Sequence, residues 1–231
     1  MSGFADIHSH MLYGIDDGAQ TRAEMEAMLD AAYADGIAFL FATPHFTPGV
    51  QPFDFDVYWS RLNEARGYCQ SRGYAMTLCT GAEILYTPLL QGYVADHRLP
   101  TLADSELLLM EFAPDIALGE MEAALELMER HGYVTVLAHI ERYACLCHGR
   151  AADKLKQRHD VRFQVNANTV LTERGFFKTR CIRRWFRDDL VDFVASDAHH
   201  VRTRPYLMQR AYDALRQRYG RDCAERLTGM R

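Results

Sequence analysis

Asp6-Ile7-His8-Ser9-His10 follows the first apolar run of this 231-residue chain. Side chains two residues apart on an extended segment point the same way, so both imidazoles can reach one metal ion. Other histidines and carboxylates recur at or just past the ends of later apolar runs: His45, Glu83, Glu111, His139, Asp197 and His199. In a barrel of alternating strands and helices these ends converge on one face, where such barrels carry their chemistry. The pattern predicts a multinuclear metal hydrolase.

Seven short apolar runs alternate with helix-like segments, as is typical of parallel strands buried on both faces. Thr21-Arg22-Ala23-Glu24 fits a capping box that opens a helix, and Gly119 to His131 forms an amphipathic helix closed by Gly132. Candidate ligands follow at least six of the seven runs, which favours an α/β barrel over a doubly wound sheet with one switch point. The expected strands are Phe4–His8, Phe39–Thr43, Ala75–Gly81, Leu107–Phe112, Val134–His139, Arg162–Asn166 and Asp192–Ser196.

Length and composition indicate one globular domain, residues 1–231, with 48% hydrophobic and 25% charged residues. The net charge of −5 and the lack of a basic block argue against nucleic-acid binding. No apolar run approaches the roughly 20 residues of a spanning helix, so no membrane insertion is expected. The first residues show no basic region followed by an apolar one, so the expected location is the cytoplasm.

Several motifs leave alternatives open when each is taken alone. Asp16-Asp17-Gly18 fits a turn and helix cap, but its closeness to His8 and His10 makes one of the two aspartates a candidate ligand. Glu83 and Glu111 end apolar strands, where an acid is poorly solvated unless it is paired or bound to a metal. Each glutamate alone would fit a salt bridge. Together with five histidines and two aspartates at equivalent positions, they indicate metal ligands.

Two cysteine motifs suggest other chemistry. Cys145-Leu146-Cys147-His148 lacks a second pair at zinc-site spacing, so free thiols are expected there. Cys181 and Arg187 fit the cysteine phosphatase pattern of cysteine, five residues and arginine. That chemistry needs a tight loop around the phosphate, normally with glycine, whereas this segment carries Trp185 and Phe186 and has a helical pattern. We interpret the match as chance.

The motifs taken together resemble the PHP (polymerase and histidinol phosphatase) superfamily. Within it, they are most similar to the bacterial manganese-dependent protein tyrosine phosphatases encoded with capsule and exopolysaccharide genes. One departure is Ile140, where relatives usually have proline. The resemblance runs from residue 6 to about residue 205, and it rests on Asp6-Ile7-His8-Ser9-His10, Asp16-Asp17-Gly18, Thr43-Pro44-His45, Gly81-Ala82-Glu83, Glu111, His139-Ile140-Glu141-Arg142 and Ser196-Asp197-Ala198-His199.

The resemblance implies a distorted seven-stranded (β/α) barrel and three divalent ions per chain, with Mn favoured over Fe, Zn or Co. It also implies that Arg142 and Arg204 bind phosphate. The implied ligands are His8, His10, Glu83 and Asp197 for the first ion, Glu83 as a bridge with Glu111 and His139 for the second, and Asp17, His45 and His199 for the third.

The implied reaction is hydrolysis of phosphotyrosine by a metal-activated water, which needs no covalent intermediate. The implied substrate is the C-terminal tail of a bacterial tyrosine kinase that regulates capsule and exopolysaccharide synthesis. Phe46, Phe53 and Tyr86 lie in loops that could line the entrance for such a tail.

Three alternatives stay open. The first is a related phosphoesterase for a small substrate such as histidinol phosphate. The second is a proofreading exonuclease, which the acidic net charge argues against. The third is a metal-binding regulatory module that docks on a kinase, and the complete ligand set argues against it.

Overall fold

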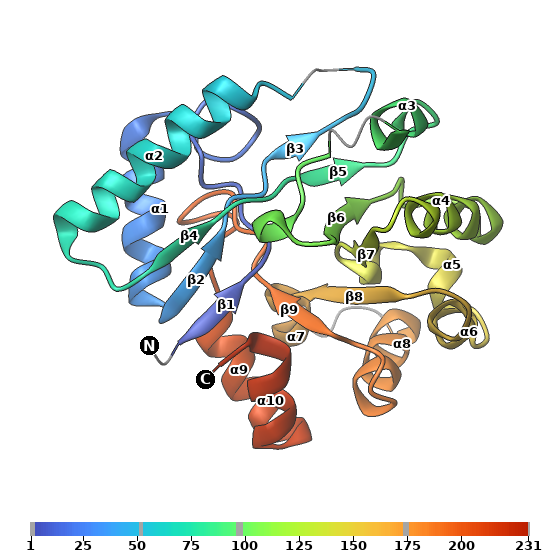
Figure 1. Ribbon diagram of the computed structural model, residues 1–231. Coiled ribbons are helices and arrows are strands. Elements are labelled where there is room, and N and C mark those ends of the chain that lie inside the picture. Colours follow the sequence, from blue (N-terminus) through green and yellow to red (C-terminus); the bar gives the residue numbers. More distant parts are fainter. Residues whose placement is uncertain (1–2, 51–52, 96–98, 173–175, 231) are drawn as a thin grey trace.

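The computed structural model describes residues 3–50, 53–95, 99–172 and 176–230. Parallel strands meet at the centre and helices cover their outside (Figure 1). All seven expected strands are present, and two short additional strands, β3 and β5, lie close to the centre. The strands are β1 (Phe4–Asp6), β2 (Ile37–Phe41), β3 (His45–Phe46), β4 (Thr77–Cys79), β5 (Glu83–Leu85), β6 (Leu107–Glu111), β7 (Val134–Leu137), β8 (Val161–Asn166) and β9 (Phe193–Ala195).

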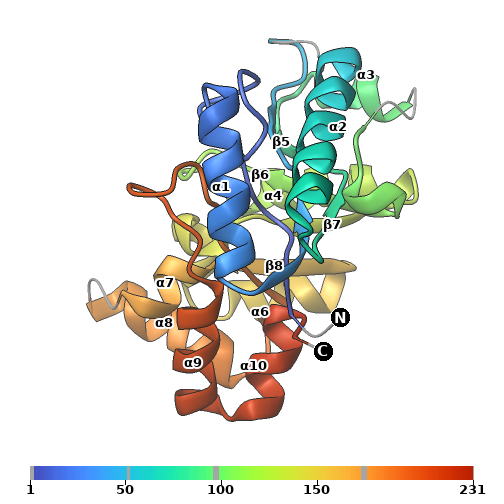
Figure 2. The same ribbon diagram turned by 90° about the vertical axis from the view of Figure 1, so that its left-hand side faces the viewer.

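The helices form a shell around the strands, with α1 and α2 together on one flank and α9 and α10 together below (Figure 2). The predicted capping box is confirmed, because the Thr21 side chain accepts a hydrogen bond from Glu24 N and the Glu24 carboxylate accepts one from Thr21 N. The helices are α1 (Arg22–Ala34), α2 (Phe55–Arg72), α3 (Leu90–Ala95), α4 (Leu118–Arg130), α5 (Ala144–Cys147), α6 (Ala151–Arg158), α7 (Ala167–Leu171), α8 (Phe176–Arg187), α9 (Met208–Tyr219) and α10 (Arg221–Thr228), with 3₁₀ turns at Leu102–Asp104 and Ile140–Arg142.

The strands form two parallel sheets, in the orders β1-β2-β4 and β3-β5-β6-β7-β8-β9. The two additional strands lie just beyond the second and third expected strands, because β3 follows β2 after a short break and β5 follows β4 in the same way. At one break, a Cβ on Gly81 would lie 2.8 Å from Leu102 Cδ2 and 3.0 Å from Thr43 Cγ2, so a larger residue there would displace these side chains. The breaks place His45 and Glu83 opposite each other on β3 and β5.

The two sheets are joined where their strands end. Asp197 N donates to His8 O at 2.9 Å, and His10 N donates to Ala198 O at 2.8 Å. Thr43 N donates to Ser9 O at 2.9 Å. These bonds hold the segments after β1, β2 and β9 together, so residues far apart in the sequence reach one face of the fold.

Alternating side chains build a core on both faces of the strands. Leu108 and Met110 of β6 pack in the large cluster that also contains the buried faces of the helices. Leu109, between them, belongs to a small second cluster on the opposite face of the strand, with Val136 and Ala195 from β7 and β9. Both faces of these strands are therefore buried, as their continuous apolar runs predicted.

Candidate metal centre

Two histidines and two carboxylates converge after β1, at β5 and after β9. His8 Nε2 lies 3.1 Å from Glu83 Oε2 and 3.5 Å from Asp197 Oδ1. His10 Nε2 lies 3.3 Å and 3.6 Å from the same two atoms. All four residues are buried, and one ligand atom from each lies within 4.8 Å of the others. This is the set expected for the first ion.

Glu83 is the central carboxylate of the site. Its Oε2 also lies 3.0 Å from His45 Nδ1, and its Oε1 lies 2.7 Å from His139 Nε2. Glu111 Oε1 is 3.6 Å from His45 Nδ1, and Glu111 Oε2 is 3.5 Å from His139 Nε2. One glutamate therefore faces both the first set and a second set of His45, Glu111 and His139, as a bridging ligand would.

The third set lies at the open side of the cluster. Asp17 Oδ1 is 3.3 Å from His45 Nε2 and 3.2 Å from His199 Nε2. His10 stacks on His199 with ring centroids 3.8 Å apart and shares this set of ligand atoms. The structure thus brings all nine predicted ligands together. It also places His45 between the second and third sets, whereas the sequence assigned it to the third alone.

Two of the predicted ligand residues have a left-handed backbone. His139 has φ 34° and Asp197 has φ 55°, values that residues other than glycine rarely adopt. Each lies two residues after the end of a strand, β7 for His139 and β9 for Asp197. Such strain persists where the surrounding structure fixes it, and it is typical of functional sites.

Four polar residues that the sequence did not single out as supports orient the ligands. Asp16 Oδ2 lies 2.7 Å from His10 Nδ1 and accepts a hydrogen bond from His45 N at 3.0 Å. Gln164 Oε1 lies 3.3 Å from His8 Nδ1 and accepts a hydrogen bond from His139 N at 2.7 Å. Asn166 Nδ2 donates to Asp197 Oδ2 at 2.7 Å. Asp6 Oδ1 accepts a hydrogen bond from Ser196 N at 2.9 Å. Gln164 and Asn166 alternate within the apolar strand β8, and this was the available signal.

The two predicted arginines meet at the same carboxylate oxygen. Arg142 Nη2 donates a hydrogen bond to Asp197 Oδ2 at 2.7 Å, and Arg204 Nη2 forms an ion pair with the same oxygen at 2.7 Å. Their side chains are 39% and 40% exposed, so both guanidinium groups border the open side of the cluster. Ile140, where relatives usually have proline, is fully buried in the turn that carries Arg142. Packing of this side chain anchors the turn.

The charges of the cluster are strongly coupled. Although burial raises the pKa of Glu83, the charge of His8 and hydrogen bonds from the other histidines hold it well below its usual range. Burial lowers the pKa of His10, but Asp16 and Glu83 outweigh it and raise that pKa to about 10. Burial and the charge of Glu83 raise the pKa of Glu111. The raised pKa values of His8, His10 and His45 mean that their protons help to balance the buried carboxylates.

Metal ions fit this donor set. Glu83 Oε2 and His199 Nε2 are buried and form no hydrogen bond among the described residues, although three imidazole nitrogens lie within 3.3 Å of the first and Asp17 Oδ1 lies 3.2 Å from the second. Such close contacts without hydrogen-bond geometry fit atoms that share a metal ion. His139 Nε2 lies 2.7 Å from Glu83 Oε1 and 3.1 Å from Arg142 Nη1, so one nitrogen faces an acceptor and a donor at once. Mixed imidazole and carboxylate ligands suit Mn, Fe, Zn and Co.

We expect Mn²⁺ binding to release protons and to strengthen as the pH rises. The pKa values of His8, His10 and His45 are raised, so these rings keep their protons to higher pH than a free imidazole does, and ligation requires their neutral form. For each proton released, the affinity for Mn²⁺ should fall by up to about tenfold for every unit by which the pH is lowered. Calorimetry at about pH 6 and about pH 8, in buffers of different ionisation enthalpy, measures both quantities. A pH-independent affinity would contradict this assignment of protons.

We expect Asp16→Asn to weaken Mn²⁺ binding by roughly 10- to 100-fold, because loss of an orienting partner typically costs that much. An amide can still accept from His45 N but supplies no charge to His10 Nδ1. Titration with Mn²⁺ measures the effect. Asp56→Asn, an exposed position on α2, is the matched control and should bind as the wild type does.

The cysteine phosphatase pattern is not a phosphate loop. Cys181 is buried within α8, and a hydrogen bond with Cys147 together with burial raises the pKa of its thiol far above the usual range. A thiolate nucleophile requires the opposite shift. We expect Cys181→Ala to keep the turnover of a phosphotyrosine peptide within about twofold of wild type. Loss of turnover by a folded variant would return Cys181 to the mechanism.

Among the described residues, no helix has both the length and the apolar character needed to cross a bilayer. This agrees with the absence of a long apolar run in the sequence.

Comparison with known proteins gives one consistent group. The family described as capsular polysaccharide synthesis, CpsB/CapC, matches residues 4–230. Tyrosine-protein phosphatase CpsB of Streptococcus pneumoniae is 30% identical over 227 residues, which cover 96% of this chain and 93% of the relative. Tyrosine-protein phosphatase YwqE of Bacillus subtilis is 27% identical over 223 residues, covering 96% and 88%.

Solved structures agree with the sequence relatives. The chain matches a structure from a study of YwqE of B. subtilis and CpsB of S. pneumoniae, which are described there as unique metal-dependent tyrosine phosphatases. The TM-score is 0.87 and the identity is 27%, and the match covers 97% of this chain and 91% of the other. Dihydropyrimidinase from Brevibacillus agri matches with a TM-score of 0.55 at 12% identity, covering 99% and 69%. The second match concerns the fold alone, a strand-and-helix architecture that many hydrolases share.

Proposed function

The chain belongs to the CpsB/CapC family of capsular polysaccharide synthesis, and we propose that its metal centre hydrolyses phosphotyrosine in proteins. It is a metal-dependent protein tyrosine phosphatase. The observation that carries this function is the convergence of nine histidine and carboxylate ligands, bordered by two arginines, at one end of the strands. We further propose that residues 1–231 form a single phosphatase domain.

The proposed centre holds three divalent ions, with Mn favoured. His8, His10, Glu83 and Asp197 would hold the first, and Glu83 would bridge to a second ion. The second ion would be completed by Glu111 and His139 and the third by Asp17, His45 and His199, with His45 also within reach of the second. Divalent ions in such a site lower the pKa of water and neutralise phosphoryl charge.

The protein's own groups would bind and orient the phosphate. Arg142 and Arg204 present planar forks that suit phosphoryl oxygens, and their shared partner Asp197 fixes both guanidinium groups. The backbone of His139 and Asp197 is held by Gln164 and by His8 O, so the ligands and the arginines form one rigid unit. A phenolate is a good leaving group, so the reaction needs a general acid less than alkyl phosphate hydrolysis does.

The proposed substrate is the phosphorylated C-terminal tail of a bacterial tyrosine kinase that regulates capsule or exopolysaccharide synthesis. A disordered tail can enter an open site in extended form. Such a kinase uses ATP, so we place the encounter in the cytoplasm. The family and its named tyrosine phosphatases favour this substrate over histidinol phosphate, the alternative from the sequence.

The test is phosphate release by metal-stripped protein, with and without added Mn²⁺. We expect turnover of a phosphotyrosine peptide only with metal, and little turnover of histidinol phosphate. Preference for histidinol phosphate would mean that the protein is a small-molecule phosphoesterase with the same metal centre. Peptide turnover that survives rigorous stripping would overturn the metal mechanism.

A further inference from the structure

A cavity of about 190 Å³ opens beside the metal centre, between the segment before Asp16, strand β3 and the start of α2. Its walls are mostly apolar or aromatic, and an apolar cavity of about 150 Å³ is enough to bind benzene. There is therefore room for one aromatic ring. The walls used in the argument below are Ile15, His45, Phe46, Phe53, Val57 and Tyr58.

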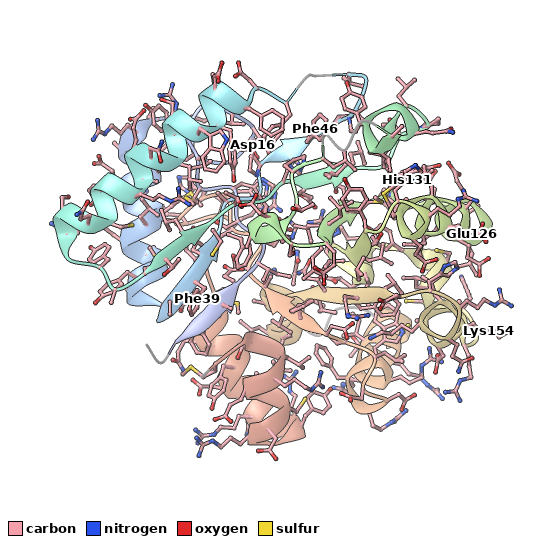
Figure 3. The ribbon with its side chains drawn as sticks, in the orientation of Figure 1. Asp16, Phe39, Phe46, Glu126, His131 and Lys154 are labelled. Atoms are coloured by element: carbon pink, nitrogen blue, oxygen red, sulfur yellow. The ribbon has the colours of Figure 1, made fainter. Side chains whose placement is uncertain are left out.

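The cavity and the metal centre share a residue. The imidazole of His45 forms part of the cavity wall, while its Nδ1 lies 3.0 Å from Glu83 Oε2. Phe46 follows His45 on β3, and Ile15 precedes Asp16, whose carboxylate accepts a hydrogen bond from His45 N. Figure 3 labels Asp16 and Phe46. The imidazole of His45 thus borders both the cavity and the carboxylate at the centre of the cluster. A phosphoryl group at the cluster would have its ester substituent within reach of the cavity.

The walls of the cavity are already fixed in this structure. Phe46 is 3% exposed and packs edge-on against Phe53, with ring centroids 5.4 Å apart. The ring centroids of Phe53 and Tyr58 are 5.2 Å apart, and Tyr58 Oη donates a hydrogen bond to Ala42 O at 3.1 Å. Preformed walls reduce the cost of ordering on binding. Tyr86, which the sequence also suggested for the entrance, packs on Phe112 instead.

The polar group at the rim is already occupied. Asp54 caps α2, because its Oδ1 accepts a hydrogen bond from Val57 N at 3.0 Å. The Val57 side chain itself is 37% exposed at the same rim. An apolar ring can therefore enter between Val57 and the aromatic walls without leaving a buried carboxylate unpaired.

We propose that this cavity is an aryl pocket, which receives the phenyl ring of phosphotyrosine while the phosphoryl group lies at the metal centre. The proposal rests on the proposed function and adds to it a basis for choosing aryl over alkyl phosphate esters. A phosphoserine side chain has no ring to fill the pocket, so it forgoes the apolar burial that a phenyl group gains.

The test uses two non-hydrolysable ligands with the same head group, methylphosphonate and phenylphosphonate, titrated calorimetrically into Mn²⁺-loaded protein. We expect wild type to bind phenylphosphonate roughly tenfold or more tightly than methylphosphonate, as burial of an aromatic ring predicts. Val57→Trp fills the cavity from its rim and should remove most of that difference. Methylphosphonate does not reach the cavity and should bind this variant as it binds wild type.

Gln70→Trp is the matched control, because it places the same side chain on an exposed site of the same helix, far from the cavity. It should keep the wild-type preference for phenylphosphonate. Equal binding of the two phosphonates by wild type, or an unchanged preference in Val57→Trp, would overturn the aryl pocket and leave the metal centre standing. Failure of both phosphonates to bind the wild type would overturn the proposed function as well.

Discussion

Glu83→Gln is expected to lower kcat/KM for a phosphotyrosine peptide by a factor on the order of 10³ or more, since metal ions supply several kcal/mol of charge stabilisation in such reactions. Glu83 is the one carboxylate within 3.3 Å of four histidines, His8, His10, His45 and His139, among the described residues. An amide of the same shape supplies no charge and ligates metal poorly. Peptide turnover and metal content by elemental analysis should fall together.

The control for this variant is Glu126→Gln on the exposed face of α4, which makes the same chemical change outside the site (Figure 3). It should retain wild-type turnover and metal content. Circular dichroism should show that Glu83→Gln is folded, because its neighbours can lose their protons when the carboxylate charge is removed. A folded Glu83→Gln protein with full metal content and normal turnover would refute the bridging role.

Arg142→Lys is expected to lower kcat/KM by about 10²-fold while the bound metal stays unchanged, a loss typical of removing one donor to a developing oxyanion. Lysine keeps the charge but not the planar fork that suits phosphoryl oxygens. Arg142 is positioned by its bond to Asp197 Oδ2, which Arg204 shares. Because they share this partner, a double Arg142→Lys and Arg204→Lys variant should lose less than the product of the single losses.

Arg202→Lys is the matched control for both arginines, since Arg202 is exposed two residues before Arg204. It should turn over the peptide at the wild-type rate. The metal measurement separates two roles for Arg142. Loss of activity with loss of metal would mean that Arg142 serves to position Asp197, and unchanged activity would remove it from phosphate binding.

The structure brings the predicted ligand residues together because most of them come at or soon after the end of a strand. Apolar runs locate strand ends, and parallel strands bring those ends to one face, so no knowledge of side-chain orientation was needed. The prediction was less complete where orientation matters. His45 lies between two ligand sets because its two ring nitrogens face Glu83 and Asp17, and a sequence cannot show how a ring is turned.

The short additional strands and the residues that support the predicted ligands were missed for other reasons. β3 has only two residues, and a periodic pattern cannot be detected over so short a segment. Asp16 was visible in its motif, yet its role depends on a 2.7 Å contact with His10 that only the folded loop creates. Gln164 and Asn166 would have been found by asking why an apolar strand carries two amides at alternate positions.

The proposed ligands come from early and late parts of the sequence, and this affects when the centre can form during synthesis of the protein. His8 and His10 leave the ribosome early, whereas Asp197 and His199, which complete their sets, follow only after all nine strands. Translation proceeds at about 5–20 residues per second, so the first histidines remain without their partners for roughly ten seconds or longer. The nascent chain therefore cannot form the complete centre, and we expect full metal binding only after nearly the whole chain has been made.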